Sequence, residues 1–163
     1  MTRETESAWK NWPLDREIVI SRVIDAPRRL VWQAWADPEQ IGAWFGPEGL
    51  AIETKEIDLR AGGIWRFDMV GEGDLRFTNR MRFLRMEEER LIEVLHGSDE
   101  DGDPAAFRML VTFDEQENGK TVITLRQMHP DAARRAEVIG FGAVEYGGQT
   151  LAKLAAHVAK HSG

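Results

Sequence analysis

The stretch that covers residues 25–49 reads "DAPRRLVWQAWADPEQIGAWFGPEG" and holds three of the chain's six tryptophans. Pro27 suits the first turn of a helix, where a missing N–H group costs nothing. Asp37 suits the N-cap of a second helix, and the pair Gly46–Pro47 suits its end. The stretch therefore predicts two short helices in succession, with their aromatic side chains on the inner faces.

On both sides of these helices, apolar and polar residues alternate along residues 17–129. Such alternation is typical of β-strands that bury one face. One predicted strand precedes the two helices. Six further strands are predicted at residues 50–59, 64–69, 75–83, 90–96, 107–113 and 121–129. Short turns such as Asn118–Gly119 separate them, so we expect an antiparallel sheet with one solvent-exposed face.

The last part of the chain, from about Ala143 to Lys160, has the spacing of a long amphipathic helix. Its inward stripe consists of Val144, Gly147, Leu151, Leu154, Ala155 and Val158. A glycine inside a helix costs about 1 kcal/mol relative to alanine, so Gly147 and Gly148 need an explanation. Either the helix approaches another backbone closely there, or a cavity lies between the helix and the sheet. The order of elements predicts an α+β domain with helices on one face of an antiparallel sheet.

The composition is that of one folded domain. The 163 residues are 42% hydrophobic and 30% charged, and we expect residues 17–163 to form a single domain after a tail of residues 1–16. Trp9 and Trp12 in that tail are expected to fold back onto the domain or to form a subunit contact, which leaves a homodimer open. Cysteine is absent, which excludes disulfides, thiolate nucleophiles and Cys-ligated metal sites.

The negative net charge of the chain disfavours some classes of binding partner. A formal net charge of −7 repels phosphate backbones and anionic lipids, so we expect neither nucleic acid nor a membrane as partner. No apolar run has the length of a signal peptide or a membrane span, and we expect a cytoplasmic protein.

The acidic loop "SDEDGDP" lacks the glycine and glutamate positions of an EF-hand, so we interpret it as a solvated turn. Arg76, Arg80 and Arg82 form a basic row that we expect to pair with neighbouring acids.

Four segments carry a resemblance to a known superfamily: "VIDAPRRLVWQAWADPEQIGAWFGPEG", "DLRAGGIWRFDM", "LHGSDEDGDPAAFRMLVTFDE" and "QTLAKLAAHVAK". With the order of elements, they are similar to the START-like superfamily, also known as birch-pollen-allergen-like or SRPBCC. Within it, the chain resembles the branch that is similar to the C-terminal domain of the activator of the ninety-kilodalton heat-shock protein's ATPase. The resemblance covers about residues 17–160.

The resemblance implies a helix-grip fold, in which a curved antiparallel sheet wraps around the long C-terminal helix and encloses an apolar cavity for small hydrophobic molecules. It does not select a chemistry, because the superfamily includes carriers, cyclases, hydroxylase components and chaperone partners. The chain also departs from the pattern. Many members carry a glycine–tryptophan pair where this chain has Tyr146–Gly147, and loss of that tryptophan would enlarge or reshape one end of the cavity.

On this fold, we expect Trp44 and Phe45 to gate the mouth of the cavity, since aromatic anchors suit an apolar guest. The expected lining comes from the aromatic face of the sheet and from the closing helix. It consists of Trp65, Phe67, Phe77, Met81, Met109 and Val111, with Phe141 and Tyr146 at the closing side. The alternative is a filled core without room for a ligand.

Polar residues that share a strand face with apolar neighbours are further candidates for the functional site. Asn79 is expected to orient a ligand or to bond to a neighbouring backbone group. His96 and His129 each end a strand, where they either act as acid or base or serve the structure. Neither a catalytic triad nor a His-rich metal spacing is present, so we assign no catalytic residue, metal or cofactor. We expect His157 and His161 to face solvent.

Three functions follow from these patterns. The leading one is binding of a small hydrophobic ligand in a cavity between the sheet and the C-terminal helix, without catalysis. One alternative is a chaperone-ATPase-activator-like protein that binds a protein partner. The other is a cyclase or hydrolase that uses Asn79, His96, His129 or Tyr146.

Overall fold

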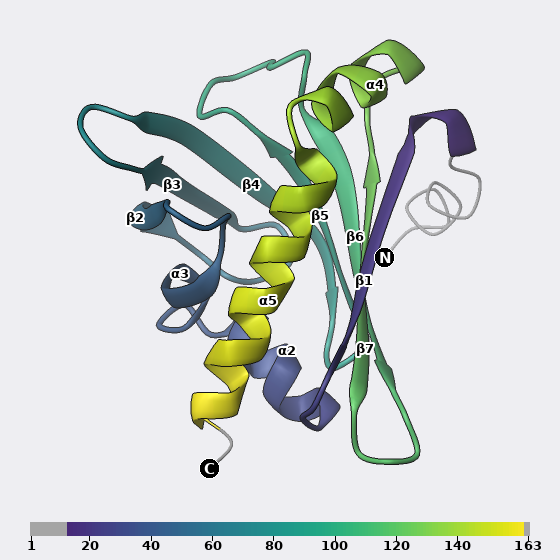
Figure 1. Cartoon of the computed structure of the whole chain (residues 1–163). Coiled ribbons are helices and arrows are strands. Elements are labelled where there is room, and N and C mark those ends of the chain that lie inside the picture. The colour runs from purple at the N-terminus through teal and green to yellow at the C-terminus, as the bar shows by residue number, and fades with distance from the viewer. Residues whose placement is uncertain (1–12, 162–163) are drawn as a thin grey trace.

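The computed structural model describes residues 13–161, so Trp9 and Trp12 lie outside the described residues. The architecture is α+β. A seven-stranded antiparallel sheet curves around one long helix near the C-terminus, and shorter helices lie towards the two ends of this helix (Figure 1). The predicted helix-grip fold is thereby confirmed.

The strands are β1 (Glu17–Ile24), β2 (Ala51–Ile57), β3 (Ile64–Val70), β4 (Arg76–Glu87), β5 (Leu91–Gly97), β6 (Phe107–Glu115) and β7 (Thr121–Met128). They lie in the order β1-β7-β6-β5-β4-β3-β2, and all neighbouring pairs are antiparallel. The helical elements are η1 (Leu14–Arg16), α2 (Arg28–Ala36), α3 (Ile41–Trp44), α4 (Ala132–Gly140) and α5 (Ala143–His161). All seven predicted strands are present, with small differences at their ends.

Both short helices after β1 are confirmed, but the second begins later than expected. Asp37 caps a turn, because its Oδ1 atom accepts a hydrogen bond from the backbone N–H of Glu39 at 2.9 Å, and α3 begins only at Ile41. We did not predict α4, which lies between β7 and α5. Its N-cap is Asp131, whose side chain accepts a hydrogen bond from the backbone N–H of Arg134 at 2.7 Å.

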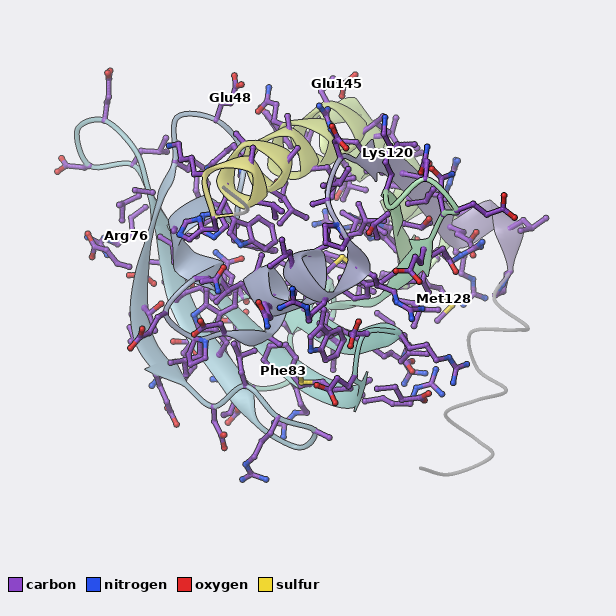
Figure 2. All side chains as sticks on the ribbon, turned by 90° about the horizontal axis from the view of Figure 1, so that it is seen from below. Glu48, Arg76, Phe83, Lys120, Met128 and Glu145 are labelled. Atoms are coloured by element: carbon purple, nitrogen blue, oxygen red, sulfur yellow. The ribbon has the colours of Figure 1, made fainter. Side chains whose placement is uncertain are left out.

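The concave side of the sheet is densely packed where α2 and α3 meet it. Trp35 and Trp44 lie edge to face with ring centroids 4.9 Å apart. Phe45 contacts both of these rings and also reaches Trp65 and Phe67 in β3. Helix α5 adds Leu151, Leu154 and Val158 to the same core. Side chains crowd the space between α5 and the sheet (Figure 2), and the aromatic residues of the opening stretch belong to this core.

The two glycines of α5 have different surroundings. A Cβ atom at Gly147 would collide with Cδ1 of Ile20 in β1, whereas nothing lies within 4 Å of a Cβ atom at Gly148. Helix α5 therefore approaches β1 closely at Gly147, although it meets a side chain and not the backbone. The predicted close approach to another backbone is therefore not found at Gly147, whereas the predicted cavity is, because Gly147 lines one.

Within residues 13–161, no helix combines the length and the apolar character that a membrane crossing needs. The same part of the chain contains no group of three or more His, Cys, Asp or Glu side chains placed to hold a metal ion. In the acidic loop, Asp99 and Asp101 instead bond to arginines, and Asp103 accepts hydrogen bonds from the backbone N–H groups of Ser98 and Ala105.

The outer face of the sheet carries an ionic cluster centred on Asp99, whose side chain is 5% exposed. Its carboxylate accepts hydrogen bonds from Nε of Arg66 at 2.9 Å and from Nε of Arg80 at 3.0 Å. These bonds hold the pKa of Asp99 well below its usual range. Arg76, which projects outward in Figure 2, pairs with Asp68 at 2.6 Å. The predicted pairing of the basic row is therefore confirmed for Arg76 and Arg80.

An Asp99→Asn substitution is expected to lower the free energy of unfolding by about 1–2 kcal/mol at pH 7. The carboxylate then no longer accepts charged hydrogen bonds from Arg66 and Arg80, and solvent around these arginines keeps the loss moderate. Since folding lowers the pKa of Asp99, its contribution is present above the unfolded pKa of about 3.9 and is lost as the pH falls towards the folded value. Urea unfolding at pH 7 and at about pH 3 should therefore show the gap between wild type and variant narrowing in acid.

The matched control is Asp101→Asn. Asp101 also pairs with Arg80, but its side chain is 96% exposed, so this substitution should leave stability nearly unchanged. A gap between wild type and Asp99→Asn that stayed constant with pH would contradict the assignment of a stabilising, ionised Asp99.

Candidate functional site

A cavity of about 200 Å³, which we call the inner chamber, lies between the sheet and α5 at the end where α4 joins α5. Its apolar wall includes Phe45, Met69, Phe107, Met109, Leu125, Val138 and Ala143. Its polar residues are His96, Gln127, His129, Tyr146 and Thr150. An apolar wall with a few polar groups is typical of a site for a small organic molecule.

Two further pockets adjoin the inner chamber. A wider groove of about 780 Å³, the vestibule, shares Met69 and Tyr146 with the chamber. A pocket of about 300 Å³, the side pocket, shares His96 and His129 with the chamber and also reaches Arg134. The three spaces share lining residues and therefore lie next to one another.

Five of the predicted site residues lie on these walls. Phe45, Met109 and Tyr146 line the inner chamber, and Tyr146 also lines the vestibule. Phe77 and Asn79 line both the vestibule and the side pocket, where Phe77 is 50% exposed. The departure at Tyr146–Gly147 thus falls on the chamber wall, since Gly147 lines the chamber too.

The other predicted site residues lie elsewhere. Four of them are fully buried and line none of the described pockets: Trp65, Phe67, Met81 and Val111. Trp44 is also buried, and its Nε1–H donates to the carbonyl oxygen of Ala34 at 3.0 Å, so it joins α3 to α2 and does not stand at a mouth. Phe141 is 67% exposed after α4, and Val138 and Ala143 take the closing position in its place.

Asn79 and His96 face each other from neighbouring strands. Nδ2 of Asn79 donates to the carbonyl oxygen of Phe77 at 3.1 Å, which leaves Oδ1 facing Nε2 of His96 at 2.9 Å. Since an amide oxygen only accepts, the hydrogen of the neutral imidazole lies on Nε2, and Nδ1 keeps a lone pair. Burial lowers the pKa of His96 to about 4, so the ring is neutral at pH 7.

His129, which is 3% exposed, has a similar arrangement just after β7. Its Nε2 lies 3.1 Å from Oε1 of Gln127, and the same argument places the hydrogen on Nε2 and a lone pair on Nδ1. That Nδ1 atom is buried, and no described residue supplies it with a hydrogen-bond partner. Burial, followed by the charges of Arg134 and Arg135, lowers the pKa of His129 to about 4.

Phe107 separates the two histidines, with ring centroids 5.1 Å from His96 and 4.7 Å from His129. This part of the wall therefore combines apolar surface with two neutral imidazoles that accept hydrogen bonds. It can orient an uncharged polar group on a largely apolar guest. We had not selected Gln127, although it lies in phase with the buried Leu125, by the criterion that selected Asn79.

The two histidines of α5 lie away from the chamber walls. His161 is exposed, as predicted. His157 is only partly exposed, because its Nε2 lies 3.0 Å from Oε1 of Gln40 and connects α5 to the segment before α3. The prediction that His157 faces solvent was therefore wrong.

Comparisons with known proteins place this geometry among relatives. A family model described as "Activator of Hsp90 ATPase homolog 1-like protein" matches residues 25–159. A solved structure from Nitrosomonas europaea is 21% identical, with 92% of this chain and 98% of that chain covered and a TM-score of 0.81. One from Mycobacterium smegmatis is 22% identical, with 93% and 96% covered and a TM-score of 0.80. One from Chromobacterium violaceum is 24% identical, with 89% and 98% covered and a TM-score of 0.72.

No protein of curated function matches the sequence. The likenesses to solved structures show a shared fold over nearly the whole of each chain. A shared fold does not determine the chemistry of the site, which depends on the residues that line it.

Proposed function

Because the chain belongs to the Activator of Hsp90 ATPase homolog 1-like family, whose helix-grip fold binds ligands or partners, we propose that it binds a small hydrophobic molecule in the inner chamber. The observation that carries this proposal is the chamber itself, an apolar space of about 200 Å³ between the sheet and α5. The mainly apolar wall of this space favours an apolar guest.

The vestibule supports an entry route for such a guest. Leu75, Phe77 and Tyr146 line it and are 48%, 50% and 50% exposed. Large apolar side chains gathered around one groove favour contact with an apolar molecule. The polar side of the chamber then orients whatever hydrogen-bonding group the guest carries.

Titration with N-phenyl-1-naphthylamine, a neutral fluorescent probe, tests the proposal. We expect saturable binding of one probe per chain, with enhanced emission in the apolar chamber and displacement by naphthalene. Native mass spectrometry of the protein from its own cells, before and after denaturation, would identify a retained natural ligand. A folded protein that binds neither probe nor naphthalene and carries no retained compound would refute ligand binding.

Catalysis by the polar residues is a second candidate. It is favoured by the grouping of Asn79, His96, His129 and Tyr146 around the three adjoining spaces. Neutral histidines can accept a proton, although pKa values of about 4 make them weak bases. Turnover of a bound compound that disappears in His96→Ala and His129→Ala variants would favour an enzyme over a carrier.

A chaperone partner is a third candidate, since the family is named for activation of the Hsp90 ATPase. Val19 and Val23 of the edge strand β1 are about half exposed and offer apolar surface to a partner. The purified protein, with and without the naphthylamine probe, can be added to a heat-shock ATPase. Unchanged ATP hydrolysis in both cases would remove this candidate without affecting ligand binding.

A further inference from the structure

One side chain of the inner chamber has a hydrogen-bond donor that no described residue accepts. Oε1 of Gln127 accepts from Nε2 of His129 at 3.1 Å, and His129 is 3% exposed, so the carboxamide is held in one orientation. The Nε2 atom of Gln127 carries two hydrogens. It has no acceptor within residues 13–161, and it is not one of the buried unpaired atoms of this range. This amide group is therefore both unpaired and accessible.

The accessible side of Gln127 faces the chamber. Gln127 lies opposite Met109 in β6 and Ile18 in β1, and both of these side chains are buried on the concave face of the sheet. Strand residues that lie directly opposite one another share a face, so the carboxamide lies on the same side as α5. Among the described pockets, Gln127 lines only the inner chamber.

The other polar side chains of the chamber offer no comparable donor. Both histidines direct their ring hydrogens at amide oxygens. Thr150 donates its hydroxyl hydrogen to the carbonyl oxygen of Tyr146 at 3.0 Å. The hydroxyl group of Tyr146 remains, but this side chain is half exposed and also lines the vestibule, so water can bond to it. Gln127 therefore carries the donor that opens only into the chamber.

The wall of the chamber is uncharged. None of the described residues that line it is Asp, Glu, Lys or Arg. Burial lowers the pKa of His96 and of His129 to about 4, so both imidazoles are neutral at pH 7. An ion that entered would lose its hydration without meeting an opposite charge, which is unfavourable. The chamber therefore favours a neutral guest.

From these observations we propose that the inner chamber binds a neutral, mainly apolar carbonyl compound, such as a ketone or an ester, whose carbonyl oxygen accepts a hydrogen bond from Nε2 of Gln127. The proposal rests on ligand binding in the inner chamber and adds the chemical class of the ligand. A carbonyl oxygen accepts without donating and carries no formal charge, so it matches both the free N–H group and the uncharged wall. A hydrocarbon guest would leave that N–H group without a partner, which costs free energy.

Three naphthalenes of similar shape test the proposal at pH 7. They are the ketone 2-acetylnaphthalene, the hydrocarbon 2-isopropylnaphthalene and the carboxylate 2-naphthoate. Each is used to displace N-phenyl-1-naphthylamine from the full chain. The readout is the ratio of the ketone and hydrocarbon affinities within one protein, because that ratio cancels changes that affect both guests equally, such as a change in the volume of the chamber.

Variants then assign the ratio to Gln127. Gln127→Met has a side chain of similar length without an N–H group, and we expect it to lower the ratio about 10-fold, as the loss of one buried hydrogen bond predicts. Gln127→Glu keeps an oxygen for Nε2 of His129 but has no hydrogen to donate when ionised, so the ratio should fall there too. The control is Gln116→Met, at an exposed position between β6 and β7 that lines none of the described pockets, and it should keep the wild-type ratio.

The outcomes distinguish carbonyl recognition from ligand binding as such. A wild-type ratio in both Gln127→Met and Gln127→Glu would overturn recognition by Gln127 and leave ligand binding in place. Tightest binding of 2-naphthoate would also overturn it, because the chamber would then recognise an anion. Failure of the probe and of all three naphthalenes to bind would remove the proposed function and this inference with it.

Discussion

An Ala143→Trp variant is expected to fold and to bind N-phenyl-1-naphthylamine about 100-fold more weakly than the wild type does. Ala143 begins α5 and lines the inner chamber, so the added indole ring would enter a space of about 200 Å³ that a guest would otherwise fill. A guest that buries roughly 120 Å² of apolar surface gains about 3 kcal/mol, which corresponds to a factor of about 100 in Kd. Fluorescence titration of both proteins measures the difference.

The matched control for this variant is Ala156→Trp on the same helix. Ala156 is exposed and lines none of the described pockets, so the same added ring should leave probe binding unchanged. Circular dichroism and thermal unfolding establish that both variants are folded. If folded Ala143→Trp bound the probe with wild-type affinity, the probe would have to bind outside the inner chamber.

A Trp44→Ala variant is expected to lose about 3–5 kcal/mol of the free energy of unfolding, as is typical when a large buried aromatic side chain is removed. Trp44 packs edge to face on Trp35 and Phe45. Its Nε1–H also donates to the carbonyl oxygen of Ala34 near the end of α2, so the substitution removes a hydrogen bond together with the packing. Urea unfolding monitored by circular dichroism measures the loss.

Trp44→Phe is the control that separates the two contributions. It keeps an aromatic ring in the core but has no N–H to donate, so we expect a loss that is smaller than that of Trp44→Ala. The pair also tests the prediction that Trp44 gates the cavity. If Trp44→Ala changed the rate of probe entry without lowering stability, Trp44 would act as a gate and not as part of the core.

Most of the fold was predictable from the sequence because the period-two alternation is clear in strands such as β3 and because short turns separate the strands. Trp65 and Phe67, for example, lie on the concave face as the alternation in β3 predicts. Helix α4 was missed because it has only nine residues and none of them is fully buried, although Val138 and Ile139 pack against the core. The start of α3 was misplaced because Asp37 can cap a turn as readily as a helix.

The site was predictable only in part, because alternation shows which face a residue occupies and not what covers it. Met81 and Phe77 share the concave face of β4, yet Met81 is fully buried beneath the helices and Phe77 is half exposed in the vestibule. The unpaired state of Nδ1 in His129 depends on Gln127 and on the position of α4, which we did not predict. No pattern along one strand contains that information.

The pairing of β1 with β7 has a consequence for how the protein is made. Residue Glu17 lies opposite Met128, and Ile24 lies opposite Thr121, so the first strand finds its partner only after five other strands have been synthesised. At a synthesis rate of about 5–20 residues per second, β1 stays unpaired for on the order of ten seconds before β7 has been made. Helix α5, which covers the concave face, emerges later still. The nascent chain therefore exposes its apolar surface until translation is nearly finished, and the domain completes its core in one late step.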